Sequence, residues 1–250
     1  PKPDREYLID GLIPKPSLGI FYGHPGSLKT MVLLDAALSV ASGMAWLGSR
    51  PGGEGGYTKK VKKAGVLWID QDSGADELER RIAAISIAKG LDEHESLFEH
   101  ICFPMPAFMA DSKQSIEDLA DYINTKGFEW VIIDCLVNVS GSGDENNSQM
   151  ADTMNGLRRL TQLTGASVTA IHHSSKDNSR NLRGHSSINS ALDYAVSVER
   201  EEDSDNITLY ATKSRMAPID TTELYFAYDP RPDKPKELLT ATFYNDPSAI

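Results

Sequence analysis

The residues with the clearest potential for chemistry lie near the amino end, where residues 23–30 read Gly-His-Pro-Gly-Ser-Leu-Lys-Thr. A glycine-containing turn between a strand and a helix directs backbone N–H groups at phosphate oxygens, and the helix N-terminus adds partial positive charge. In this turn Lys29 would neutralise the β- and γ-phosphates of a nucleotide, and the Thr30 hydroxyl would bind Mg²⁺. The expected nucleotide-binding residues are Gly23, His24, Pro25, Gly26, Ser27, Leu28, Lys29, Thr30 and Met31.

This turn departs from the usual phosphate-binding pattern at one position. The pattern G-x-x-x-x-G-K-[ST] has glycine directly before the lysine, whereas this chain has Leu28. A side chain must then be placed beside the nucleotide phosphates, which weakens the match. The alternative interpretation is an ordinary strand-to-helix turn with a chance lysine, but the strand before the turn and the helix after it favour a phosphate site.

Carboxylates follow two apolar strands farther along the chain. Residues 130–134 read Trp-Val-Ile-Ile-Asp, so Asp134 would lie at the C-terminal end of a strand, where a carboxylate can hold the hydration shell of Mg²⁺. Residues 66–72 read Val-Leu-Trp-Ile-Asp-Gln-Asp, and a carboxylate at the end of this strand can polarise an attacking water. Asp70 and Asp72 compete for this role, and they point the same way if the strand continues to Asp72.

Two histidines end another apolar strand, in the run Ile-His-His-Ser-Ser-Lys at residues 171–176. A polar side chain here can sense the γ-phosphate and relay its loss to the loop that follows. Adjacent histidines without a nearby Cys or Glu lack the i, i+4 spacing of a zinc-binding helix. We therefore interpret His172 or His173 as a phosphate sensor and not as a metal ligand.

The elements that must position these residues alternate between strand-like and helix-like segments through the first two-thirds of the chain. Strands with two apolar faces, separated by helices, predict a mostly parallel central sheet flanked by helices. The expected strands are Leu18–Tyr22, Gly65–Asp70, Ile101–Phe103, Trp130–Asp134 and Ser167–His172. The expected helices are Lys29–Ser42, Asp76–Lys89, Ser115–Lys126 and Ser148–Thr164.

The pattern changes after about residue 190, where strand-like segments are joined by short polar turns. They predict antiparallel strands at the C-terminal edge of the sheet. The expected segments are Ala191–Arg200, Ile207–Lys213, Glu223–Tyr228 and Leu238–Tyr244. We expect one α/β domain over residues 1–250, with a lead-in segment at 1–16 and edge strands from 191 to 250.

Composition excludes several classes of protein. With 25 Lys+Arg against 36 Asp+Glu the formal net charge is −11, so any nucleic-acid contact must be confined to a local basic surface. No apolar run reaches the roughly 18 residues that span a bilayer, which excludes an integral membrane protein. Cys102 and Cys135 are too few for a disulfide framework, so we expect reduced core thiols in a cytoplasmic protein.

Together these motifs resemble the RepA-like branch of the RecA-type P-loop ATPases, the hexameric replicative helicases of plasmids and phages and their relatives. The resemblance runs from Tyr7 to Arg215 and is carried by residues 22–30, Asp134, 171–176 and 183–187. It implies a RecA-like fold and an ATP- and Mg²⁺-dependent, ring-forming helicase or translocase that acts on single-stranded DNA in replication. Recombination or annealing ATPases of the RecA/RadA type and KaiC-like assembly ATPases without a DNA partner share this core and stay open as alternatives.

The resemblance also implies roles for individual residues around the nucleotide. Lys29 and Thr30 bind phosphate and Mg²⁺, and Asp134 is the Walker B acid that shares the metal. The general base of the family is usually a glutamate, and Asp72 stands at its place with a shorter side chain. Arg81 resembles the family arginine near the nucleotide, and the alternative is a solvated charge on a helix face.

Three more positions carry roles by resemblance. His173, weakly preferred over His172, resembles the γ-phosphate sensor. Lys213 and Arg215 resemble the basic pair that RecA-type rings insert into the ATP site of the neighbouring subunit, where an arginine stabilises charge on the transferring phosphoryl group. The alternative is a pair of solvated charges at a strand end.

Two loops of RecA-type rings face the central channel, and they correspond here to residues 138–148 and 174–187. The first holds no basic residue, whereas the second holds Lys176, Arg180 and Arg183, which suit the phosphate backbone of single-stranded DNA. The alternative for the second loop is a solvated connection without a ligand. A further basic segment, residues 48–63, fits an interface, a nucleic-acid contact or a linker equally well.

Overall fold

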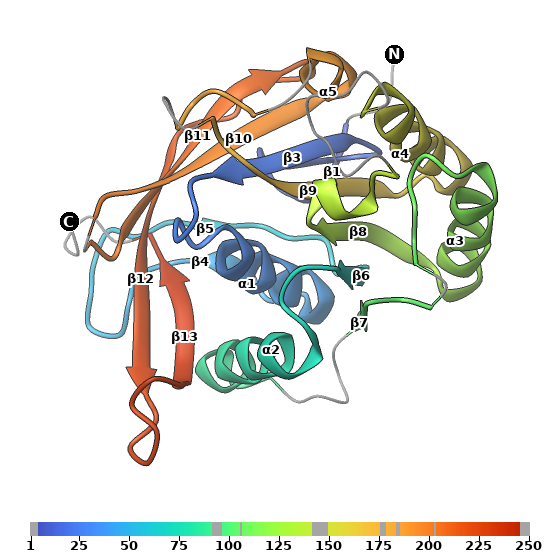
Figure 1. The fold of residues 1–250 in the computed structure, drawn as a ribbon. Coiled ribbons are helices and arrows are strands. Elements are labelled where there is room, and N and C mark those ends of the chain that lie inside the picture. The colour runs from blue at the N-terminus through green and yellow to red at the C-terminus, as the bar shows by residue number, and fades with distance from the viewer. Residues whose placement is uncertain are drawn as a thin grey trace.

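A nine-stranded sheet runs through the centre of the computed structural model, in the order β13-β12-β11-β10-β3-β9-β8-β6-β7 (Figure 1). The structure describes residues 5–91, 97–105, 107–141, 150–175, 179–183, 186–202 and 204–245. From β10 to β7 neighbouring strands pair in parallel, and β11, β12 and β13 extend the sheet antiparallel at one edge. The predicted α/β class, with a mostly parallel sheet and antiparallel edge strands, is confirmed.

Most strands lie within two residues of their predicted bounds, but β7 begins at Phe98 and ends at Cys102, whereas the prediction was Ile101–Phe103. The parallel strands are β3 (Leu18–Gly23), β6 (Gly65–Asp70), β7 (Phe98–Cys102), β8 (Phe128–Asp134), β9 (Ser167–His173) and β10 (Tyr194–Arg200). The antiparallel strands are β11 (Asn206–Ser214), β12 (Thr222–Pro230) and β13 (Leu238–Tyr244). Two small hairpins lie outside this sheet, formed by β1 (Glu6–Ile9) with β2 (Ile13–Lys15) and by β4 (Trp46–Leu47) with β5 (Thr58–Lys59).

Helices cover both faces of the sheet, as the two apolar faces of its strands require. They are α1 (Lys29–Ser42), α2 (Ala75–Lys89), α3 (Lys113–Lys126), α4 (Met150–Thr164) and the short α5 (Ser186–Ala191), with a 3₁₀ turn η1 (Leu136–Val139). Side chains alternate between the faces along β8, since Ile132 packs in the core with α1 and α2 while Val131 and Ile133 pack in the core with α3 and α4.

The prediction for Ala191–Arg200 is confirmed on one side of the strand and wrong on the other. Ala191 ends α5 and the strand begins only at Tyr194. β10 pairs antiparallel with β11, as predicted, but in parallel with β3. A parallel neighbour needs a crossover connection, and α5 lies in that connection. Gly19 of β3 and Tyr194 of β10 are partners in this pairing. A Cβ on Gly19 would lie 1.9 Å from the ring of Tyr194, so glycine is required at this position.

The basic segment 48–63 is not simply a loop. Its Thr58–Lys59 forms β5 against β4, and Lys62 forms ion pairs with Glu6 and Glu129. Arg50 lies over the ring of Tyr225, 5.9 Å from its centroid. Several of its cations therefore have partners within this chain.

One buried polar cluster ties the first helices to the antiparallel edge. Asp35, fully buried on α1, accepts hydrogen bonds from Trp46 Nε1 at 2.8 Å and from Thr242 Oγ1 at 2.9 Å. Lys89 Nζ, at the end of α2, lies 3.2 Å from the same carboxylate. The buried charge is thus paired and hydrogen-bonded, as stability requires, and the cluster holds β13 beside α2.

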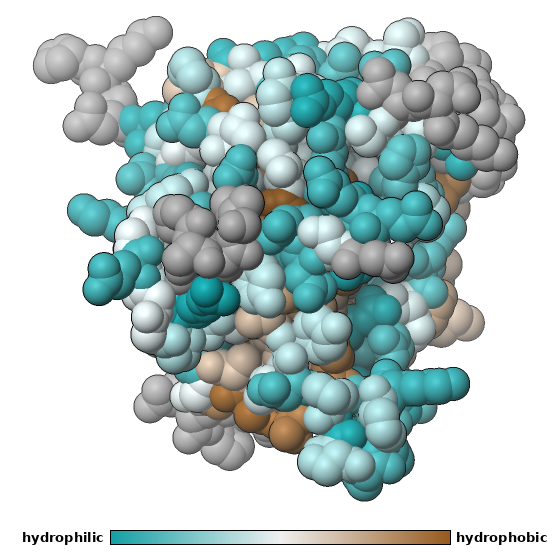
Figure 2. All heavy atoms as spheres, turned by 90° about the vertical axis from the view of Figure 1, so that its left-hand side faces the viewer, coloured by the Kyte–Doolittle hydropathy of each residue, from teal (hydrophilic) through white to brown (hydrophobic). Residues whose placement is uncertain are grey.

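Figure 2 shows a mostly hydrophilic face in which apolar side chains gather toward the lower part. Both cysteines are free, but Cys135 alone is a buried core thiol; Cys102 is half-buried because β7 is the edge strand, which corrects the expectation for it. Among the described residues no helix is long and apolar enough to cross a membrane.

Candidate nucleotide site

The phosphate-binding turn connects β3 to α1 at the C-terminal end of the central strands. Its backbone closes through a hydrogen bond from Ser27 N to His24 O at 3.2 Å. Lys29 Nζ donates to His24 O at 2.7 Å, so the ammonium group already lies within the turn. Burial lowers the pKa of Lys29, while the carboxylates of Asp134 and Asp72 oppose that shift. An ammonium group held over inward-facing backbone is the arrangement that neutralises a bound phosphate.

Leu28 explains why the turn tolerates the missing glycine. Its backbone has φ +65° and ψ +22°, the left-handed conformation that glycine adopts without cost, and it forms the N-cap of α1. Its half-buried side chain packs against the core that contains α1. The chain therefore keeps the backbone path of a phosphate-binding turn, and the apolar contact of the Leu28 side chain offsets part of the backbone strain.

The proposed metal ligands lie together. Thr30 Oγ1 donates to Asp134 Oδ2 at 2.8 Å, which joins the start of α1 to the end of β8. Asp134 is almost fully buried, and this burial, with the nearby charges of Asp72 and Asp70, raises its pKa to about 7. A hydroxyl beside a carboxylate in an electronegative crevice fits Mg²⁺, which takes oxygen ligands and would restore the ionised form of Asp134.

Asp70 and Asp72 have different surroundings. β6 ends at Asp70, whose carboxylate accepts hydrogen bonds from the backbone N–H groups of Asp72 at 3.2 Å, Ser73 at 3.1 Å and Gly74 at 2.7 Å. The strand does not continue to Asp72, so the condition under which both carboxylates would point the same way is not met. Asp72 lines the cavity that holds Lys29, and its role toward a water stays a prediction.

The cavity beside the turn has a volume of about 500 Å³ and continues between α2 and the β12–β13 hairpin. Arg81 lies on its α2 side, where its guanidinium donates to Glu77 at 2.9 Å and to Ser73 Oγ at 3.3 Å. Phe226 and Leu238 line the other side. The phosphate end is therefore polar and the far end partly apolar, as a nucleotide with a flat base requires.

Both histidines line this cavity, so the choice between them stays a prediction. His172 is fully buried, its Nε2 lies 3.0 Å from Arg183 O, and burial lowers its pKa to about 4, so its ring is neutral. His173 is half-buried, and its carbonyl accepts a hydrogen bond from Arg183 N at 3.3 Å. His172 thus contacts the loop that follows β9 through its ring, and His173 contacts it through its backbone carbonyl.

Two residues that the sequence analysis did not assign to the nucleotide site also contact the phosphate-binding turn. Ser174 Oγ lies 3.1 Å from His24 Nδ1, and Arg200 at the end of β10 donates to Gly26 O at 3.4 Å. They come from strands on either side of β3, so only the strand order brings them to the turn.

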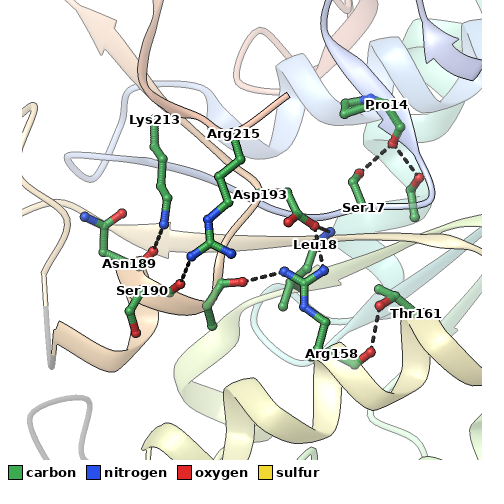
Figure 3. A network of polar contacts seen from close by, with 12 residues as sticks. Pro14, Ser17, Leu18, Arg158, Thr161, Asn189, Ser190, Asp193, Lys213 and Arg215 are labelled. Carbon is green, nitrogen blue, oxygen red and sulfur yellow. Dashed lines mark hydrogen bonds and ion pairs between the residues drawn. The ribbon is translucent and has the colours of Figure 1, made fainter. Parts of the chain in front are cut away.

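Lys213 and Arg215 lie at the opposite end of the parallel strands from the phosphate-binding turn. Arg215 N donates to Asp193 O at 2.8 Å, and Asp193 precedes the start of β10, level with the start of β3 (Figure 3). The turn follows the other end of β3. The pair is therefore separated from its own nucleotide site by the length of the parallel strands.

The candidate DNA-binding residues differ in their surroundings. Arg180 forms an ion pair with Glu199 at 2.9 Å, and its guanidinium lies 4.2 Å from the centroid of the Tyr210 ring. Arg183 lies in the same loop, next to the His172 and His173 contacts. Lys176 falls outside the described residues.

The strand order and the turn between β3 and α1 define a RecA-like α/β fold with a turn of the P-loop type. The AAA domain family model matches residues 1–179, and the chain belongs to this family. The crystal structure of the RadB recombinase is similar over 85% of this chain and 89% of its own, with a TM-score of 0.60 and 15% sequence identity. At that identity the likeness shows the fold alone. No curated protein matches the chain.

Proposed function

We propose that this chain is a Mg²⁺-dependent ATPase of the RepA-like type that assembles head to tail into a hexameric ring and moves along single-stranded DNA during plasmid or phage replication. The observation that carries the proposal is the placement of two half-sites at opposite ends of the parallel strands. Lys29 and Asp134 lie at the C-terminal ends, and Lys213 and Arg215 lie level with the N-terminal ends. Head-to-tail contact brings the unlike ends together and closes a ring when the rotation allows it.

The residues of the turn divide the work of phosphoryl transfer. Lys29 binds the β- and γ-phosphates, while Thr30 and Asp134 would hold Mg²⁺, which spreads the charge of the phosphates when bound. Asp72 orients the attacking water from the turn after β6. The shorter side chain of Asp72, compared with glutamate, favours slow turnover in the absence of a partner.

The remaining roles link hydrolysis to assembly and to DNA. His173, next to the loop after β9, reports the γ-phosphate to that loop. Arg215 of one subunit, with Lys213, stabilises the transferring phosphoryl group of the next, a contribution of about 10³–10⁵ in rate where such arginines act. Arg180 and Arg183, with Lys176 of the same loop, contact the DNA backbone.

A complementation experiment tests the shared active site. Lys29→Ala should lose nucleotide binding, and Arg215→Ala should keep binding but lose turnover, whereas the control Arg159→Ala, which changes an exposed arginine paired with Glu117, should do neither. Mixing the two inactive variants should restore turnover, because intact turns then face intact arginines. Normal turnover by Arg215→Ala alone, or no recovery on mixing, would contradict the proposal.

A recombination or annealing ATPase is the second candidate, because the fold resembles the RadB recombinase over 85% of the chain. A KaiC-like assembly ATPase is the third, because Arg180 is paired within the chain and the net charge is −11. ATP turnover measured with and without single-stranded DNA separates the third from the others. Displacement of a strand from a forked duplex selects the helicase, and annealing without displacement selects the recombinase.

A further inference from the structure

The last turn of α5 contacts three cations, one from α4 and two from the end of β11 (Figure 3). Three consecutive carbonyl groups each accept a hydrogen bond from a different side chain. The pairs are Lys213 with Asn189, Arg215 with Ser190 and Arg158 with Ala191. Carbonyls at a helix C-terminus have no partner within the helix and carry partial negative charge, so they are suitable acceptors for cations.

Asp193 fixes this turn against the rest of the fold. Its carboxylate is nearly buried and accepts hydrogen bonds from Leu18 N at 2.8 Å and from Arg158 at 2.6 Å. Its carbonyl accepts Arg215 N at 2.8 Å. Asp193 and Arg158 thus join the end of α5 to the start of β3, to α4 and to the end of β11.

The three cations are not equivalent in this arrangement. Arg158 has a formal counter-charge in Asp193, and its guanidinium bridges that carboxylate and the Ala191 carbonyl. Lys213 and Arg215 have neutral carbonyls as their described acceptors, and burial, together with the nearby charge of Arg215, lowers the pKa of Lys213. A triphosphate, with formal negative charge, binds such cations more strongly than carbonyls do.

We propose that Arg158 and Asp193 are positioning residues that hold the last turn of α5 as a dock for Lys213 and Arg215, so that the pair stays on its own subunit until the nucleotide of a neighbouring subunit draws it away. The inference rests on the proposed function, because it assumes that Arg215 acts in the neighbouring site. The dock competes with assembly, and weakening it makes assembly easier.

The test is the dependence of ATP turnover on protein concentration in the Arg158→Gln variant. We expect the concentration that gives half-maximal turnover to fall by about threefold, the size that weakening the exposed contacts of Lys213 and Arg215 with α5 gives, with the maximal rate unchanged. Arg159→Gln is the matched control, since it removes the same charge from the neighbouring position of α4, where the arginine contacts Glu117 and not α5. It should leave the half-maximal concentration unchanged.

Three results overturn the inference. The first is an unchanged half-maximal concentration with a lowered thermal midpoint, which indicates a purely structural role. The second is a raised half-maximal concentration, and the third is an equal shift in the Arg159→Gln control. Should Arg158→Gln fail to fold, Arg158→Lys keeps the charge beside Asp193 but cannot bridge to Ala191 as a guanidinium does, and the same downward shift is required of it. Normal turnover by Arg215→Ala would instead refute the proposed function itself.

Discussion

Leu28 gives the sharpest test of how the phosphate-binding turn is built. At φ +65° a residue with a Cβ is destabilised by roughly 1–2 kcal/mol relative to glycine. Glycine also makes the unfolded chain more flexible, which lowers the free energy of unfolding by less than about 1 kcal/mol. Replacing Leu28 by Ala keeps the strain, and replacing it by Gly removes the strain. Both changes lose nearly the same apolar contact with the core. The Gly variant should therefore be the more stable by about 1 kcal/mol.

The comparison reverses the usual order of these residues in helices. Relative to the parent, Leu28→Ala should lose about 1–2 kcal/mol, because the side chain is half-buried, and Leu28→Gly should lose less than half of that. In a chain of 250 residues a difference of 1 kcal/mol moves the thermal midpoint by about 2–4 °C. Denaturant unfolding of the two variants, with m-values compared, measures the difference directly.

Asp121, exposed in the middle of α3, is the matched control. There Asp121→Gly should be less stable than Asp121→Ala by about 1 kcal/mol, because helical backbone favours alanine. Leu28→Gly should also keep its affinity for an ATP analogue, since the backbone path of the turn is unchanged. If Leu28→Ala proved as stable as Leu28→Gly or more so, the left-handed conformation at this position would be refuted.

Three further predictions concern the carboxylates after β6, the buried His172 and the ion pair of Arg180. Asp70→Ala should lower the free energy of unfolding by about 2–3 kcal/mol, because three backbone N–H groups lose their acceptor, while Asp72→Asn should reduce ATP turnover with an unchanged thermal midpoint; the reverse pattern would exchange their roles. His172 has a folded-state pKa lowered from 6.5 to about 4 by burial, so the unfolded chain takes up a proton that the folded chain refuses. The free energy of unfolding should then fall as pH drops from about 6.5 to about 4, by up to about 1.4 kcal/mol per pH unit, and His172→Gln should lose that slope in a pH series of unfolding curves. Glu199→Gln releases Arg180 from its ion pair, so single-stranded DNA should bind more tightly and with a steeper dependence on salt; unaltered binding would remove Arg180 from the interface.

Much of the fold could be predicted because hydrophobic periodicity is a local property of the sequence. The bounds of α1, β6 and β13 agree with the predicted Lys29–Ser42, Gly65–Asp70 and Leu238–Tyr244. The choice of strand partners is not local, and β10 shows the consequence. Its apolar pattern suits a parallel or an antiparallel neighbour, and β10 has one of each, because it pairs antiparallel with β11 and in parallel with β3, where Tyr194 fits over Gly19.

The candidate site divides in the same way. Residues 23–30 lie in one continuous segment, so the sequence indicates the phosphate-binding turn. The contacts of Ser174 and Arg200 with that turn depend instead on which strands flank β3. Asp70 and Asp72 could not be told apart from spacing, because the answer depends on the residue at which the strand stops. The hydrogen bonds to Asp70 supply that information, since a carboxylate that holds three N–H groups of its own turn has little capacity left for a water.

The sheet also explains why hydrolysis should depend on assembly. Arg215 is hydrogen-bonded to Asp193, which in turn donates to Leu18 O, so Arg215 is level with the first residue of β3 while the phosphate-binding turn follows Gly23. Five residues of strand span about 16 Å, longer than an arginine side chain. β10 lies between β3 and β11 and adds a lateral separation of about 10 Å. No rotamer of Arg215 can cover this distance within one subunit, so a catalytic role for this residue requires a second copy of the chain.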